Sequence, residues 1–230
     1  MLKIEHFSNG ILKDINFELK DLQHLIVLGS NGAGKSTLAK VLCGLLPSES
    51  VELFLQKLHH LNAKQRAKLI NYVPPKLEIF DEYITLREYL QVGRLYGDMT
   101  VDEVLELLDL KLLQNKACIT LSSGEQQLAL LGLSLLHNAK LTIFDEPTAN
   151  LDPKKSQKVA EILFGTKIQS RIIITHDLNL AYKLGYKILY MSHGEVEFFG
   201  ENRTFFEDAN LEMLFGSSIK RIDDYFVVNL

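Results

Sequence analysis

Residues 25–37 read Leu25-Ile26-Val27-Leu28-Gly29-Ser30-Asn31-Gly32-Ala33-Gly34-Lys35-Ser36-Thr37. Residues 29–37 match G-x-x-x-x-G-K-[ST] in full, between a strand predicted over Leu25–Leu28 and a helix predicted over Gly34–Leu45. Glycines let backbone N–H groups turn toward an anion, and the helix N-terminus adds about half a positive charge. The alternative, an ordinary glycine-rich turn with a solvated lysine, would not need both the pattern and its context. The stretch predicts a P-loop NTPase core in which Lys35 reaches the β- and γ-phosphates and Ser36 holds magnesium.

A second candidate site follows the apolar run Leu141-Thr142-Ile143-Phe144, which predicts a buried strand that ends at Asp145 and Glu146. Open α/β sheets bind their ligands at the carboxyl edge of the strands. Asp145 is therefore expected to hold magnesium, and Glu146 to polarise an attacking water. The alternative is a strand that merely leaves the core at two acids, and the phosphate loop upstream argues against it.

Short apolar runs alternate with helical patterns along the chain, which is typical of an α/β fold with a mostly parallel sheet. Further strands are predicted over Ile70–Val73, Arg171–Thr175 and Lys187–Tyr190, and further helices over Asn62–Leu69, Pro153–Leu163 and Leu178–Leu184. Residues 2–19 predict an N-terminal antiparallel β subdomain with a turn at Ser8-Asn9-Gly10, and residues 187–199 predict a hairpin with a turn at His193-Gly194.

The middle of the chain, from about residue 75 to residue 136, loses its strand signals and predicts an inserted helical lobe. Thr100 is followed three residues later by Glu103, a capping box that starts a helix over Val101–Leu108. The last thirty residues predict a helix over Phe205–Phe215 and a strand over Tyr225–Val228.

Composition bounds the class of protein. The 230 residues are 47% hydrophobic with a net charge of −4, which excludes disorder as the main state and disfavours bulk binding of nucleic acid. Cys43 and Cys118 lie in apolar stretches without C-x-x-C spacing, so a disulfide framework or a zinc site is not expected. The longest apolar run, Leu128–Leu136, is far shorter than the ~20 residues of a membrane span. We expect a soluble, cytoplasmic chain.

Three further segments define a family resemblance. They are Leu121-Ser122-Ser123-Gly124-Glu125-Gln126-Gln127, Glu146-Pro147-Thr148-Ala149-Asn150-Leu151-Asp152, and Ile174-Thr175-His176-Asp177-Leu178-Asn179. Together with the phosphate loop, and in this order, they resemble the ATP-binding cassette (ABC) ATPases over nearly the whole chain. The resemblance implies that residues 1–230 form a single ABC nucleotide-binding domain.

The resemblance also implies roles for individual residues. ATP would be bound with Mg²⁺ by the phosphate loop, Gly29, Ser30, Asn31, Gly32, Ala33, Gly34, Lys35, Ser36 and Thr37, with Ser36 and Asp145 as the metal residues. Glu146 and His176 would be catalytic, and His176 would contact the γ-phosphate. In a head-to-tail homodimer, the partner's ATP would be contacted in trans by Ser122, Ser123, Gly124, Glu125 and Asp152. Ser122 and Asp152 could equally be plain helix caps.

Two stretches, residues 85–94 and 175–181, look most like importer subunits for iron–siderophore complexes, haem or cobalamin. The resemblance implies a subunit that powers separate transmembrane permease subunits, meets a substrate-binding protein only indirectly, binds no nucleic acid and sits on the inner face of the membrane through the permease. The helical lobe would be the surface that meets the permease.

The chain departs from the family pattern at several positions. Ser123 and Glu125 stand where glycine and glutamine are usual, and Pro75 stands where the family has a glutamine that links magnesium, water and the transport partner. Proline has no side-chain amide, so hydrolysis could be slow or the coupling rewired. For the adenine base, Phe7 is the aromatic residue of the N-terminal hairpin, and stacking and a core position are equally open for it.

Rival functions follow from these departures. A soluble nucleotide-dependent regulatory module with little hydrolysis is kept open by Pro75. A cassette protein acting on DNA or ribosomes would need a second cassette or a long coiled-coil insert, and the short spacing from Lys35 through Ser122 to Asp145 leaves no room for one. A small-molecule kinase would leave the segment at 121–127 unexplained.

Overall fold

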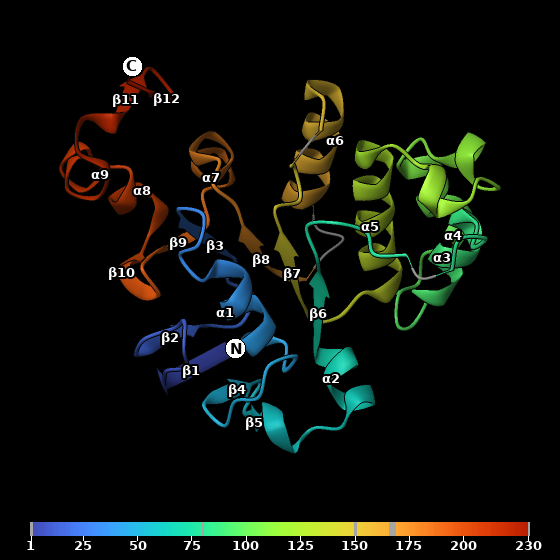
Figure 1. The fold of residues 1–230 in the computed structure, drawn as a ribbon, viewed down its shortest axis with the longest axis horizontal. Helices are drawn as coiled ribbons and strands as arrows, with labels where there is room; N and C mark the ends of the chain where they lie inside the picture. Colours follow the sequence, from blue (N-terminus) through green and yellow to red (C-terminus); the bar gives the residue numbers. More distant parts are fainter. Residues whose placement is uncertain (1, 80, 150, 166–168, 230) are drawn as a thin grey trace.

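A six-stranded sheet forms the centre of the molecule (Figure 1). The computed structural model describes residues 2–229 except 80, 150 and 166–168. In sheet order the strands are β10 (Glu195–Gly200), β9 (Lys187–Ser192), β3 (Leu25–Gly29), β8 (Ser170–Ile174), β7 (Leu141–Asp145) and β6 (Ile70–Val73). All neighbours are parallel except the hairpin of β9 and β10. Every residue of β3, β7 and β8 is buried, which explains their continuous apolar runs.

The predicted N-terminal subdomain is a four-stranded antiparallel sheet of β2 (Ile15–Leu19), β1 (Leu2–Phe7), β4 (Val51–Leu53) and β5 (Gln56–Lys57). Together with α1 (Lys35–Leu42) and the face of the central sheet that is turned toward it, this subdomain encloses one hydrophobic core. The side chain of Asn9 accepts hydrogen bonds from the backbone N–H groups of Ile11 and Leu12, which closes the predicted turn between β1 and β2.

The helical lobe consists of α3 (Leu86–Val92), α4 (Val101–Leu107), α5 (Ser123–His137) and the 3₁₀ turns η2 (Lys111–Leu113) and η3 (Cys118–Thr120). It lies beyond β6 at one end of the sheet (Figure 1), and its leucines share a second core with the far face of the sheet. Before it come η1 (Leu58–His60) and α2 (Ala63–Leu69). Helices α3, α4 and α5 each begin with a capping box, which confirms the one predicted at Thr100 and Glu103.

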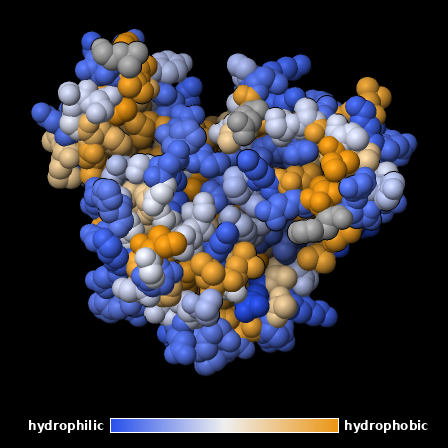
Figure 2. All heavy atoms as spheres, in the orientation of Figure 1, coloured by the Kyte–Doolittle hydropathy of each residue, from blue (hydrophilic) through white to orange (hydrophobic). Residues whose placement is uncertain are grey.

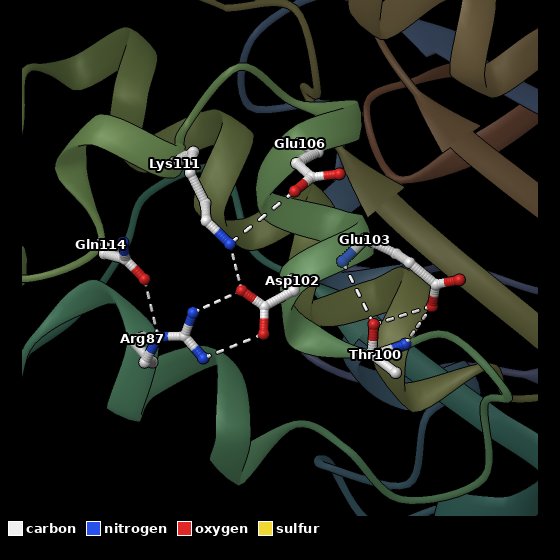
Figure 3. Close-up of polar contacts among 7 residues, drawn as sticks. All are labelled: Arg87, Thr100, Asp102, Glu103, Glu106, Lys111 and Gln114. Carbon is white, nitrogen blue, oxygen red and sulfur yellow. Dashed lines mark hydrogen bonds and ion pairs between the residues drawn. The ribbon is translucent and has the colours of Figure 1, made fainter.

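A network of charged side chains joins the elements of the lobe (Figure 3). The guanidinium of Arg87 on α3 donates to both carboxylate oxygens of Asp102 on α4 and, through Nε, to Gln114 at 2.8 Å. Lys111 contacts the same carboxylate. These two cations lower the pKa of Asp102 to about 2. The lobe is therefore tied together by polar contacts on its surface as well as by its leucine core.

The C-terminal part differs in detail from the prediction. The helix expected over Phe205–Phe215 is wrong at its start, because α8 (Asn202–Phe205) ends at a bend and α9 (Asp208–Phe215) follows. The bend lets both Phe205 and Phe206 face the core, where each is at most 2% exposed. The predicted strand over Tyr225–Val228 is β12, and it pairs with β11 (Ile219–Ile222), which the sequence did not indicate. A 3₁₀ turn, η4 (Gly216–Ser218), precedes that hairpin.

The remaining helices are α6 (Pro153–Phe164) and α7 (Leu178–Leu184), close to their predicted bounds. Asn179 of α7 anchors the C-terminal hairpin, because its side chain exchanges two hydrogen bonds with the backbone of Phe226. Among the helices of the described residues, none combines the length and the apolar character needed to cross a lipid bilayer.

His24 sits at the entry to β3, where its Nδ1 accepts a hydrogen bond from the backbone N–H of Arg171 and its ring packs on Tyr186. Burial, with a smaller contribution from the positive charge of Arg171, lowers the pKa of His24 to about 4. The imidazole is therefore neutral in the folded chain under conditions in which the unfolded chain protonates it.

We expect the folded state to lose stability as the pH falls from about 6.5 toward 4, because His24 is then protonated in the unfolded state but stays neutral in the folded state. Between pH 7 and pH 5 this one group should lower the free energy of unfolding by about 2 kcal/mol. Urea unfolding of wild type and His24→Gln at both pH values measures the effect. An equal loss in the two proteins would contradict it, since every other histidine is common to both.

Gly194, in the turn between β9 and β10, lies against the loop that follows β1. Its φ is +83°, and a Cβ there would come within 2.0 Å of the carbonyl oxygen of Ile11. The Gly194 carbonyl also accepts a hydrogen bond from the N–H of Lys13 at 2.8 Å. The turn predicted at His193-Gly194 thus supports the N-terminal loop.

Gly194→Ala should lower the free energy of unfolding by about 2–4 kcal/mol, because backbone strain and a steric clash add together. Gly185→Ala is the matched control, since Gly185 has a φ of +68° but no heavy atom lies within 4 Å of the point that its Cβ would occupy. The control should lose only about 1 kcal/mol. Equal losses of unfolding free energy in the two variants, measured by urea unfolding, would show that the close contact with Ile11 does not affect stability.

Candidate functional site

The loop at residues 29–34 joins β3 to α1 as predicted, although α1 ends at Leu42 rather than at Leu45. Gly29 and Gly34 have φ values of +151° and +98°, and atoms of other residues lie close to the Cα of each. A Cβ on Gly29 would lie 2.3 Å from the carbonyl oxygen of Met191 in β9, and one on Gly34 would lie 2.7 Å from the side chain of Leu12. These two positions accept only glycine.

Lys35, the first residue of α1, is a nearly buried cation with 7% of its surface exposed. Its ammonium donates to the carbonyl oxygens of Gly29 at 2.7 Å and Ser30 at 2.9 Å. Burial lowers the pKa of Lys35, and the charges of Glu146 and Asp145 partly oppose that shift. An anionic oxygen at this point would give the ammonium a charge-assisted partner in place of neutral carbonyls.

Asp145 and Glu146 follow one another at the carboxyl end of β7, as predicted. Asp145 is 1% exposed, and its Oδ2 accepts a hydrogen bond from the hydroxyl of Tyr72 on β6 at 2.9 Å. Glu146 has a left-handed backbone with φ of +51°, held by its N–H bond to the Ile174 carbonyl and by the Gln127 amide, which donates to the Glu146 carbonyl. Burial and the Asp145 charge raise the pKa of Tyr72, so its hydroxyl stays a donor.

His176 follows β8, the neighbour of β7 in the sheet. Its Nδ1 lies 3.0 Å from both carboxylate oxygens of Glu146 and can donate to them. The histidine is 67% exposed and the glutamate 18%, so the pair sits at the rim of the site. The structure thus brings the two residues that were expected to be catalytic into contact.

A pocket of about 330 Å³ joins the loop to the two acids. It is lined by Ile11, Asn31, Gly32, Gly34, Lys35, Ser36, Thr37, Pro75, Asp145 and Glu146. Gly29, Ser30 and Ala33 shape the loop without lining the pocket. Figure 2 shows mainly hydrophilic residues across the middle of this face, between the C-terminal part and the helical lobe.

Ile11 is the pocket residue that sequence reasoning missed. Phe7, the aromatic considered for the adenine base, is 8% exposed and belongs to the N-terminal core. Ile11 is 53% exposed and lies next to Gly34 of the loop. The signal that could have found it is a lone isoleucine directly after the polar turn Ser8-Asn9-Gly10.

The chemistry of the pocket suits a metal–triphosphate pair. Ser36 and Asp145 face the same pocket and offer a hydroxyl and a carboxylate, which are oxygen ligands of the kind Mg²⁺ prefers. Mg²⁺ commonly takes one or two protein ligands and completes its shell with water and substrate phosphate. The residues present therefore fit the expected group.

The second set of predicted residues lies outside this pocket. Ser122 caps α5: its hydroxyl accepts from the N–H of Glu125, and the Glu125 carboxylate accepts from the N–H of Ser122 at 2.7 Å. The hydrogen bond from the Ser122 backbone N–H to the carboxylate is the largest cause that lowers the pKa of Glu125. Asp152 caps α6 by accepting from the N–H of Lys155, which lowers its own pKa. Ser122 and Asp152 are thus both helix caps, as one of their two expected roles requires.

Glu125 and Asp152 nevertheless come together around a second pocket of about 200 Å³. Lys154, Lys155 and Lys158 of α6 line it as well, and a Cβ on Gly124 would lie 3.1 Å from the Lys155 side chain. Ser123 is exposed at the first position of α5. Asn150, in the segment before Asp152, lies outside the described residues.

Comparison with known proteins identifies the family to which the chain is related. The sequence profile of the ABC transporter family matches residues 12–149. The molybdate/tungstate import ATP-binding protein WtpC of Methanocaldococcus jannaschii is 30% identical over 97% of this chain and 78% of its own length. The energy-coupling factor transporter ATP-binding protein of Ureaplasma parvum is 31% identical over 89% of this chain and 72% of its own.

Among solved structures, a dimeric ATP-binding cassette in a post-hydrolysis state with ADP and phosphate is 25% identical. It superposes with a TM-score of 0.71 over 88% of this chain and 99% of that one. The profile covers more than half of the chain and includes the phosphate loop together with Asp145 and Glu146. The chain belongs to the ABC transporter family of ATP-binding proteins.

Proposed function

We propose that residues 1–230 form one nucleotide-binding domain that binds and hydrolyses ATP to drive an ABC importer. The convergence of Lys35, Ser36, Asp145 and Glu146 on one pocket is the observation that carries the proposal. Each has a different chemical task in phosphoryl transfer, and the two pairs come from distant points of the chain. The pair formed by Glu146 and His176 at the rim adds the groups that water activation needs.

In this proposal the loop N–H groups and Lys35 neutralise the phosphates, while Ser36 and Asp145 would hold Mg²⁺. The metal would supply further neutralisation of the phosphate charge. Glu146 accepts a proton from the attacking water while the oxygen of that water bonds to the γ-phosphorus. ADP leaves with the electrons of the broken P–O bond. His176 orients the Glu146 carboxylate through the 3.0 Å contact and contacts the γ-phosphate.

The proposed assembly is a head-to-tail homodimer. The residues at the start of α5, Ser122, Ser123, Gly124 and Glu125, together with Asp152, lie outside the pocket of their own chain and would serve the ATP of the partner. The start of a helix of fifteen residues suits an anion, because its first N–H groups and its dipole favour negative charge. The solved cassette that is 25% identical to this chain is described as dimeric, which supports a dimer.

As a transport subunit the chain would lie in the cytoplasm on the inner face of the membrane, bound to permease subunits through its helical lobe. A substrate-binding protein would act only through the permease, and no nucleic acid is involved. We propose an iron complex, haem or cobalamin as the solute, on the resemblance of residues 85–94 and 175–181. The relative named for molybdate and tungstate import supports import as the direction.

The second candidate is a nucleotide-dependent regulatory module with little hydrolysis. Pro75 favours it, because the structure places this proline in the lining of the pocket. A proline there offers neither a side-chain amide nor a backbone N–H to the attacking water.

Glu146→Gln should lower the rate of phosphate release by about 100-fold or more while leaving ATP binding intact, because the amide keeps the shape but cannot take the proton. Steady-state phosphate release with Mg²⁺ and a direct ATP binding isotherm measure the two effects. Glu197→Gln, an exposed acid on β10, is the control and should leave both unchanged. Undiminished turnover in Glu146→Gln would assign the base elsewhere.

Pro75→Gln should raise the rate of phosphate release by about tenfold or more, because a side-chain amide would enter the pocket where the attacking water is held. Pro74→Gln, one residue outside the lining, should not. Fast wild-type turnover with no gain in Pro75→Gln would show that the missing amide does not limit hydrolysis and would remove the support for a regulatory module.

A further inference from the structure

Tyr72 holds a polar contact that no role described so far requires. It is the third residue of β6, where it pairs in register with Ile143 of β7. From this neighbouring strand its hydroxyl reaches the end of β7 and donates to Oδ2 of Asp145 at 2.9 Å. The ring itself is half-buried and packs on the N-terminal core.

Asp145 depends on such a partner. The residue is 1% exposed, and a buried carboxylate without hydrogen bonds is strongly unfavourable. The bond to Tyr72 commits Oδ2 and fixes the rotation of the carboxylate about its last side-chain bond. The remaining oxygen can then meet a ligand in the pocket that Asp145 lines.

The place of Tyr72 in the chain gives the bond a further meaning. Three residues later β6 has ended and Pro75 lines the same pocket. Proline cannot send a polar side chain toward the metal residues. A polar contact between this segment and Asp145 nevertheless exists, and it runs through the Tyr72 hydroxyl.

We propose that Tyr72 is a positioning residue that orients the Asp145 carboxylate for Mg²⁺. The proposal rests on the proposed function, since it takes Asp145 as a metal residue. Groups that hydrogen-bond a metal-binding carboxylate hold its geometry, and their loss typically costs 10- to 100-fold in metal affinity. The hydroxyl of Tyr72 should therefore affect the metal and leave the base, the sugar and the phosphate loop untouched.

The test compares the affinity of the full chain for the non-hydrolysable analogue adenylyl imidodiphosphate in Mg²⁺ and in EDTA. The ratio of the two dissociation constants reports how much the metal adds to binding, without any turnover. Tyr72→Phe keeps the ring and removes only the hydroxyl. Its affinity in EDTA should equal that of wild type, and its Mg²⁺ ratio should fall by about tenfold. The Mg²⁺ concentration for half-maximal binding should rise to match.

Tyr186→Phe is the matched control, because the Tyr186 hydroxyl also donates one 2.9 Å hydrogen bond from a half-buried ring, to the carbonyl of Leu163. It should leave the ratio at the wild-type value, even where the two variants lose similar stability in urea unfolding. Such a result would separate a metal-directed role of Tyr72 from a structural one.

Three outcomes would overturn the proposal, and they differ in what else they overturn. An unchanged ratio in Tyr72→Phe, with Mg²⁺ clearly strengthening wild-type binding, rejects the role of Tyr72 alone. A wild type that binds the analogue equally well in Mg²⁺ and EDTA also rejects the assignment of Asp145 to the metal. A wild type that does not bind the analogue at all rejects the proposed function itself.

Discussion

The site is organised around one buried cation. The Lys35 ammonium is held off water between two carbonyls of its own loop, and the two acids at the end of β7 are the opposite charges that act on it. A buried charge is tolerated only where partners are fixed in advance. Gly29 and Gly34 provide that fixation, because they let the loop pack closely against Met191 and Leu12. Loop, sheet edge and N-terminal subdomain therefore depend on one another through the position of this lysine.

The acids in turn are fixed by residues from three different elements. Tyr72 of β6 holds Asp145, His176 after β8 contacts Glu146, and Gln127 of α5 holds the Glu146 backbone in its left-handed conformation. None of these contacts is local in sequence. The order of β6, β7 and β8 in the sheet makes the contacts of Tyr72 and His176 possible, because the carboxyl ends of parallel strands meet at one edge.

The contrast explains what the sequence could predict. Most strand and helix positions, the loop context and the caps at Thr100 and Asp152 follow from patterns within a few residues, and the structure confirms them. Ile11 and Tyr72 could not be found that way, because their contacts with the site depend on which strands become neighbours. The break at Phe206 has the same origin: aromatic packing in the core overrides a continuous helical pattern.

Helix α5 connects the pocket that contains Glu146 with the second set of predicted residues, which begins at Ser122. Its first residues form the capped N-terminus at Ser122, and one turn further along Gln127 is buried and donates to the Glu146 carbonyl. In the proposed dimer the first of these points meets the partner's nucleotide while the second supports the acid beside the chain's own. A rigid helix cannot shift at one end and stay fixed a turn later. Closure of the dimer on one nucleotide would then shift Glu146 at the other nucleotide, so the two ATP sites of the dimer are expected to act together.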